Sequence, residues 1–165
     1  MKKLFLLLII TFLMVGCEMA NTPTSVVDNL FSKYQRVDDD INAGINSVLD
    51  EQNLTDVHRE RYRKLLEKQY KNLSYEVKEE TIDGDNAIVT VEIEVIDYHR
   101  AVSDLTFDSS IYTKENFDEE KLNRLEAMND KVTYTLDLTL TKDTDGNWRL
   151  NALTNEQIKK IQGMY

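Results

Sequence analysis

The sequence predicts an α+β fold, with N-terminal helices packed on a curved antiparallel sheet of about four strands and a short C-terminal helix. Two observations support this prediction. Apolar residues recur every three or four positions from residue 23 to about residue 71, which is the spacing of one helix face. After residue 72 the period changes to two and the alternating stretches are separated by turn sequences. A sheet with one polar and one apolar face needs helices on only one side.

Three helices are expected before the sheet. Thr22 followed by Pro23 is typical of a helix start, with a hydroxyl cap and proline in the first turn. The apolar period runs up to three consecutive aspartates, residues 38–40, and then continues as a second helix or as a bent continuation of the first. Thr55 is expected to cap a third helix that ends near Lys71.

The strands are expected to form hairpins. Alternation begins at Leu73, and the sequence Asp-Gly-Asp-Asn at residues 83–86 is typical of a hairpin turn. A second such turn is expected at residues 145–147, before Trp148 opens a final strand. The residues predicted to face the core on the two central strands are Val89, Val91, Ile93, Val95, Val132, Tyr134, Leu136, Leu138 and Leu140.

Two further helices are expected. The connection over residues 101–130 is helical in its second half, with Asp118 as the predicted cap and Phe117 packing onto Leu122. Thr154 starts a capping box for the C-terminal helix, and Gly163 is expected to end that helix.

The N-terminus predicts a cleaved secretion signal over residues 1–16. Two lysines precede an apolar run from Leu4 to Val15 that is interrupted only by Thr11. A helix of that length spans roughly 18 Å, which is short of the ~30 Å hydrocarbon core of a bilayer. A permanent membrane-spanning helix is therefore the weaker interpretation.

The end of this segment resembles the lipobox of bacterial lipoproteins. Gly16 directly precedes Cys17, and Met14 stands where the family usually has leucine. The resemblance implies cleavage between Gly16 and Cys17 and attachment of acyl chains to Cys17. Residues 17–22 are then the lipidated cysteine and a short tether, residues 23–165 form one α+β domain, and the protein is lipid-anchored on the extracytoplasmic face of the cell membrane.

Charge and cysteine content limit the function classes. Cys17 is the one cysteine of the chain, so no intrachain disulfide is expected. Loss of residues 1–16 removes Lys2 and Lys3 and changes the formal net charge from −10 to −12. Nucleic-acid binding requires basic patches that release counterions, so a nucleic-acid partner is not expected.

The strand pair around DGDNAIVTVEIEV and the closing pair around TLTKDTDGNWRL, together with the lipobox and N-terminal helices, resemble small Gram-positive lipoproteins with a nuclear-transport-factor-2-like, cystatin-like domain. In that fold a curved sheet and its helices form a cone whose mouth often takes a small ligand. The resemblance covers most of residues 23–153. It implies no catalytic residue set, because no matching motif is present and the family is functionally diverse.

One ionisable pair is a weak candidate for catalysis. Asp97 and His99 continue the odd-numbered positions of the preceding strand and could face inward as a base or ligand-binding pair. The alternative is a solvated pair at the rim of the sheet, which we favour. The other predicted inward positions carry no acid or base, which argues against a buried active site.

The remaining polar clusters are interpreted structurally. Asp143, Asp145 and Asn147 faintly resemble a calcium loop but lack its first and last ligands, and residues 38–40 are expected to be a solvated linker. His58 has no companion ligands and Trp148 is expected in the core. We therefore expect no metal and no cofactor.

The leading hypothesis is a non-enzymatic binding or accessory module with a small-molecule or protein ligand. The alternatives are a small hydrolase or isomerase that uses Asp97 and His99 at the mouth of the cone, and a structural envelope protein that docks to a partner.

Overall fold

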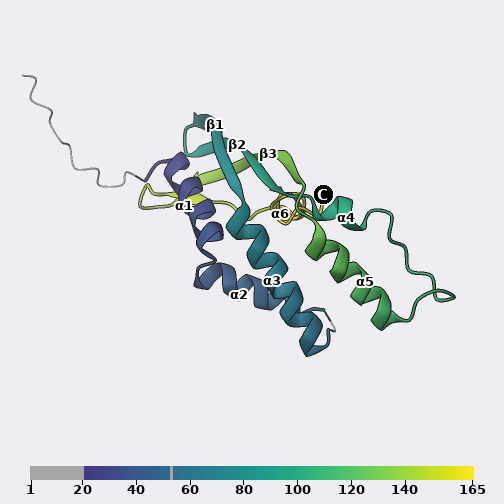
Figure 1. Ribbon diagram of the computed structural model, residues 1–165. Coiled ribbons are helices and arrows are strands. Elements are labelled where there is room, and N and C mark those ends of the chain that lie inside the picture. Colours follow the sequence, from purple (N-terminus) through teal and green to yellow (C-terminus); the bar gives the residue numbers. More distant parts are fainter. Residues whose placement is uncertain (1–20, 53) are drawn as a thin grey trace, which may run out of the picture.

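The computed structural model describes residues 21–52 and 54–165 (Figure 1). The signal segment, Gly16 and Cys17 lie outside the described residues. The elements follow one another as α1 (Pro23–Arg36), α2 (Asp39–Asp50), α3 (Asp56–Asn72), β1 (Ser74–Asp83), β2 (Asn86–Ile96), α4 (Tyr98–Val102), α5 (Lys114–Ala127), β3 (Lys131–Lys142), β4 (Trp148–Leu150) and α6 (Asn155–Ile161).

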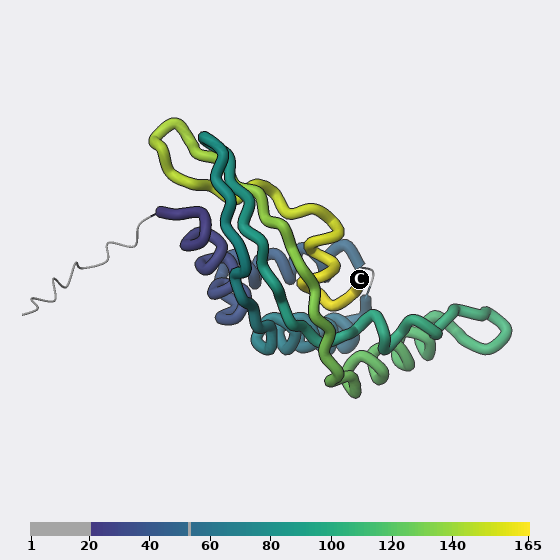
Figure 2. The backbone as a smooth tube through the Cα atoms, turned by 90° about the horizontal axis from the view of Figure 1, so that it is seen from above, coloured from purple at the N-terminus to yellow at the C-terminus, as the bar shows by residue number. Residues whose placement is uncertain are grey.

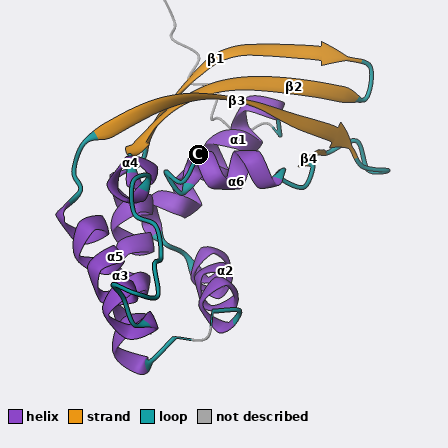
Figure 3. Cartoon of the chain, turned by 90° about the vertical axis from the view of Figure 1, so that its right-hand side faces the viewer, coloured by secondary structure: helices purple, strands orange, loops and turns teal. Residues whose placement is uncertain are grey.

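The strands form one antiparallel sheet in the order β1-β2-β3-β4. Figure 3 shows this sheet curved over the helices, with α1 and α6 directly beneath it and α2, α3 and α5 farther below. Figure 2 shows the long strands running side by side across the molecule. The predicted α+β class, with helices on one face of a curved four-stranded sheet, is confirmed.

The predicted helix starts before the sheet are confirmed. The Thr22 side chain accepts a hydrogen bond from the Ser25 amide, and Pro23 is the first residue of α1. Val37 adopts the left-handed conformation (φ 51°) and ends α1, so α2 is a separate helix whose cap is Asp38. Thr55 caps α3 as predicted.

The main core lies between the inner face of the sheet and the helices, and it includes buried residues of α1, α2, α3 and α6. The four predicted inward residues of β2 are fully buried, as are Val27 and Phe31 of α1. On β3, Leu136, Leu138 and Leu140 are buried, whereas Val132 and Tyr134 are only half-buried near the strand's start. The face assignment from the sequence is therefore confirmed.

A second apolar cluster lies where α3, α4 and α5 meet. Its buried members are Leu65, Ile96, Tyr98, Ala101, Leu122 and Leu125. The helices described between residues 21 and 165, with residue 53 set aside, do not combine the length and hydropathy that a membrane crossing needs.

The predicted start of α5 is wrong. The helix begins at Lys114, four residues before Asp118, and its cap is Thr113, whose hydroxyl accepts from the Asn116 amide at 3.3 Å. Phe117 does not staple the helix start; its ring packs edge-on against Phe107, with ring centroids 5.3 Å apart. Phe117 lies in the first turn of α5 rather than before it, and the loop that carries Phe107 folds back onto this turn.

Alanine substitutions at two neighbouring residues of β3 should differ strongly in their effect on the free energy of unfolding. Leu136→Ala should lower the free energy of unfolding by roughly 2–5 kcal/mol, because Leu136 is 1% exposed and its loss leaves a cavity. Thr135→Ala on the exposed face should cost well under ~1 kcal/mol. Urea denaturation of the two variants measures both values. Equal losses would contradict the assignment of the faces.

Candidate functional site

The structure does not bring Asp97 and His99 together as an inward-facing pair. Asp97 is the cap of α4, and its carboxylate accepts a hydrogen bond from the Arg100 amide at 3.0 Å. His99 is exposed, and its backbone amide donates to the Gly163 carbonyl at 2.7 Å. Across the described residues no hydrogen bond or ion pair joins the two side chains.

The alternation fails because the strand ends one residue before Asp97. Val95 is fully buried, and Ile96 and Tyr98 are each 3% exposed, so the alternation is lost at Ile96 and the first residue of α4, Tyr98, faces inward. The Tyr98 hydroxyl donates a hydrogen bond to the Leu65 carbonyl at 3.2 Å. Burial raises the pKa of Tyr98 to about 12, so the phenol stays protonated at neutral pH. The residue between the two candidates is thus the one that faces the interior.

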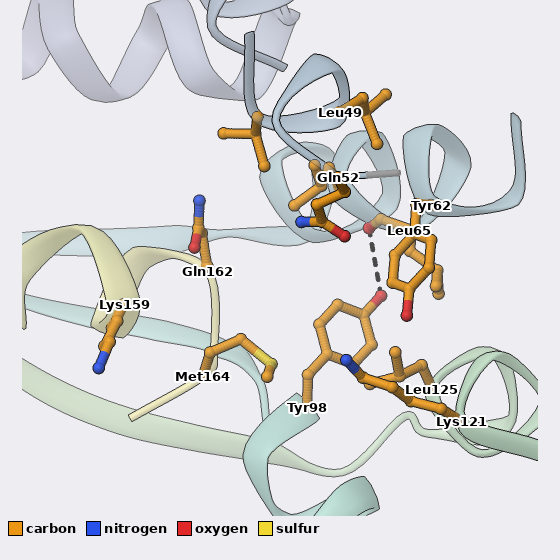
Figure 4. Close-up of a pocket in the computed structure, with 12 residues that line it drawn as sticks. Leu49, Gln52, Tyr62, Leu65, Tyr98, Lys121, Leu125, Lys159, Gln162 and Met164 are labelled. Carbon is orange, nitrogen blue, oxygen red and sulfur yellow. Dashed lines mark hydrogen bonds between the residues drawn. The ribbon is translucent and has the colours of Figure 1, made fainter. Parts of the chain in front are cut away.

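Tyr98 lines a cavity of about 400 Å³ on the helical side of the molecule (Figure 4). The walls come from α2, α3 and α5, from the end of α6 and from the C-terminal residues. Its apolar lining consists of Val48, Leu49, Leu65, Leu66, Leu125 and Met164. The cavity therefore borders the second apolar cluster through Leu65, Leu125 and Met164 and the main core through Leu49 and Leu66. Its described lining includes no residue of a strand.

Five further lining residues bring polar groups to this cavity: Gln52, Tyr62, Lys121, Lys159 and Gln162. The described residues that line it include no aspartate or glutamate, although the chain carries thirty acidic residues. Burial, and then the charge of Asp118, raises the pKa of Tyr62 to about 12, so this phenol also stays neutral. The cavity thus offers donors and apolar surface but no carboxylate.

A network of charged residues holds α5 beside α3 along one wall of the cavity. The Arg61 guanidinium contacts Glu119 at 2.8 Å and Glu126 at 2.7 Å, and it lowers the pKa of both carboxyl groups. His58 is 7% exposed, and its Nε2 lies 3.3 Å from Glu119. The sequence showed no partner for His58, because Glu119 is sixty-one residues away.

The opposite wall depends on a buried amide. Gln69 is fully buried on α3 and bonds both backbone groups of Ile96: its Nε2 donates to the carbonyl and its Oε1 accepts from the amide, each at 2.9 Å. Gly163 packs directly against this pair with φ 68°. The close contact fixes the chain end, whose neighbours Gln162 and Met164 line the cavity.

The remaining polar clusters have structural roles. Oδ1 of Asp143 accepts from the Asp145 and Asn147 amides, and Oδ2 contacts Arg149 at 2.8 Å, so this carboxylate is used within the hairpin turn. The contact with Arg149 lowers the pKa of Asp143. Asp38 caps α2 rather than lying in a linker. In the described part of the chain no group of three or more His, Cys, Asp or Glu residues is arranged to hold a metal ion.

Comparison with known proteins gives one structural similarity. No protein-family model matches the chain, and no curated protein matches it. Among solved structures the chain is similar to ycdA of Bacillus subtilis, which is named as a candidate lipoprotein, with 15% sequence identity and a TM-score of 0.42. The match covers 74% of this chain and 45% of the Bacillus chain.

Proposed function

We propose that this chain is a lipid-anchored extracytoplasmic protein that acts as a non-enzymatic binding module, with the cavity between α2, α3, α5 and α6 as its binding site. The observation that carries the proposal is the cavity itself. A volume of about 400 Å³ falls within the range of small-molecule sites, ~300–1,000 Å³. Apolar walls with a few polar groups are typical of such sites.

The same residues favour binding over catalysis. General acid–base chemistry needs a titratable group within hydrogen-bond reach of the substrate, with its pKa tuned toward neutral pH. The titratable groups of the described lining are two tyrosines, whose pKa values are raised to about 12, and two lysines; it includes no carboxylate, histidine or cysteine. The hydrolase or isomerase alternative rested on Asp97 and His99, neither of which lines the cavity.

Support for the anchor comes from the lipobox pattern and from the position of Asn21. The Asn21 side chain bonds both the amide and the carbonyl of Trp148 at the start of β4. Asn21 is four positions after Cys17, and four residue steps span at most ~14 Å. With acyl chains on Cys17, the end of the molecule that carries the β3–β4 turn therefore lies next to the membrane surface.

A second candidate function is docking to an envelope partner. Phe107 and Ile111, in the loop between α4 and α5, are 49% and 68% exposed. The Phe117 ring on α5 contacts the rings of two residues of this loop, Phe107 and Tyr112, with centroids 5.3 Å and 5.4 Å away. Exposed apolar side chains on a packed loop favour a protein contact, which is compatible with a ligand in the cavity.

We expect Val48→Trp to abolish binding in the cavity, because the larger side chain fills it from α2. The probe is a diazirine-bearing fatty acid methyl ester, which is apolar and uncharged. It is applied to the mature chain in phosphatidylcholine nanodiscs, and mass spectrometry maps the crosslinked peptides. The parent chain should be crosslinked on peptides that contain Leu66 and Leu125.

Ile82→Trp is the matched control, since Ile82 is 52% exposed on β1 and away from the cavity. It should leave crosslinking unchanged. Circular dichroism checks that both variants fold. Crosslinks confined to the sheet or to residues 103–113, or an equal loss in both variants, would contradict the proposed site.

A further inference from the structure

We propose that the ligand is an anionic amphiphile, an apolar chain with one carboxylate or phosphate head, and that Lys121 binds the head. This inference rests on the proposed function and adds the chemical class of the ligand. In the part of the chain that the structure describes, the lysine side chains differ in whether they have an ion-pair or hydrogen-bond partner.

Lys121 and Lys159 differ from the other lysines between residues 21 and 165. Of the eleven lysines in this part of the chain, eight form ion pairs. Lys68 donates instead to the Met128 carbonyl and to Asn129. The ammonium groups of the remaining two, Lys121 and Lys159, make neither a hydrogen bond nor an ion pair within the described residues, and both side chains line the cavity.

An ammonium group without an anion beside an apolar surface favours an anionic ligand. Lys121 is half-buried, and its Nζ lies 5.8 Å from the centroid of the Tyr62 ring. Figure 4 shows the Lys121 side chain directed toward Tyr98, whereas the Lys159 ammonium points toward the outside of the cavity. Lys121 is therefore the residue that binds the anionic head group. Lys159 adds positive charge at the rim of the cavity.

Two neutral donors, Tyr62 and Gln52, line the same cavity as Lys121. The Tyr62 hydroxyl makes no hydrogen bond within the described part of the chain, and its raised pKa keeps it protonated. The side-chain amide of Gln52 likewise makes no hydrogen bond within the described residues. Figure 4 shows this amide directed into the cavity. A carboxylate or phosphate has several acceptor oxygens, so it could accept from the ammonium and from these groups together.

The acidic surface does not cancel this local charge. Asp118, whose charge acts on Tyr62, is paired with Lys114 at 3.1 Å. Exposed charges beyond ~8 Å are screened at physiological salt. The apolar lining extends from this head-group position to Val48 and Leu49 on α2, which provides the surface for a hydrocarbon chain.

The test uses the mature chain in phosphatidylcholine nanodiscs with two photoactivatable probes, a diazirine-bearing fatty acid and its methyl ester. The parent chain should be half-saturated by the acid at a lower concentration than by the ester. Lys121→Met should raise the half-saturating concentration of the acid about tenfold, as expected for a hydrogen bond to a charged group, and leave that of the ester unchanged. Lys121→Arg should retain most of the preference.

Lys64→Met is the matched control, because it removes the same charge from the exposed side of α3, where Lys64 pairs with Glu60. It should leave both probes unchanged. Equal binding of acid and ester by the parent, or an equal loss in Lys64→Met, would overturn the anionic class and leave the cavity as a binding site. Failure of both probes to label the cavity would overturn the proposed function as well. Competition by dodecanoate or by dodecyl phosphate identifies the preferred head group.

Discussion

Cys17→Ala is expected to abolish incorporation of labelled palmitate and to leave an unprocessed or released protein. Cys17 is the one thiol of the chain, and it occupies the position that the lipobox pattern requires. Each buried methylene of an acyl chain contributes about 0.8 kcal/mol to membrane binding, so two or more chains hold a protein stably.

Metabolic labelling and membrane fractionation measure this result. Cys17→Ser is the closest control, because it keeps the size of the side chain and lacks the thiol, and it should behave like Cys17→Ala. A Cys17→Ala chain that is fully processed and still cofractionates with membranes after an alkaline wash would contradict the anchor.

Gly163→Ala is expected to lower the free energy of unfolding by about 3 kcal/mol or more. A methyl group at this position would overlap the Ile96 carbonyl oxygen and the Gln69 amide nitrogen. Neither group can move away cheaply, because they are hydrogen-bonded to each other in the interior. The left-handed backbone (φ 68°) adds its own cost for a residue with a β-carbon.

Gly146→Ala separates the cost of steric overlap from the cost of the left-handed backbone. Gly146 also has a positive φ, 82°, but a methyl group there meets no atom within 4 Å. Its loss in urea denaturation should be about 1 kcal/mol, the conformational cost alone. Equal losses in the two variants would show that Gly163 is not packed against Ile96 and Gln69. In that case, packing of Gly163 would not explain how Gln162 and Met164 are held in the cavity wall.

The sequence predicted the parts of the fold that depend on local patterns. Side chains alternate along β2 and β3 because one face is buried, so Val89 to Val95 and Leu136 to Leu140 could be assigned without a structure. Thr22 and Thr55 were recognised as caps because their chemistry is local. The hairpin turn at Gly84 follows from the same kind of signal.

The candidate site could not be predicted in this way. Alternation assigned Asp97 and His99 to the inner face, but Asp97 begins a helix and reverses the pattern, so Tyr98 points inward. The start of α5 was misplaced because Asp118 resembles a cap, whereas the residue that caps the helix is Thr113. The cavity combines residues from Val48 to Met164, and no local pattern relates them.

Methyl NMR of the mature chain in nanodiscs tests the central claim, a ligand site among the helices, most directly. Dodecanoate is titrated, and the methyl resonances of isoleucine, leucine and valine are followed. The account predicts that resonances of Val48, Leu66 and Leu125, which line the cavity, shift with a common saturation curve, while those of Ile82 and Ile88 on the sheet stay in place. Shifts confined to Ile82, Ile88 or Ile111, or no saturable shift at the three cavity residues, would contradict it.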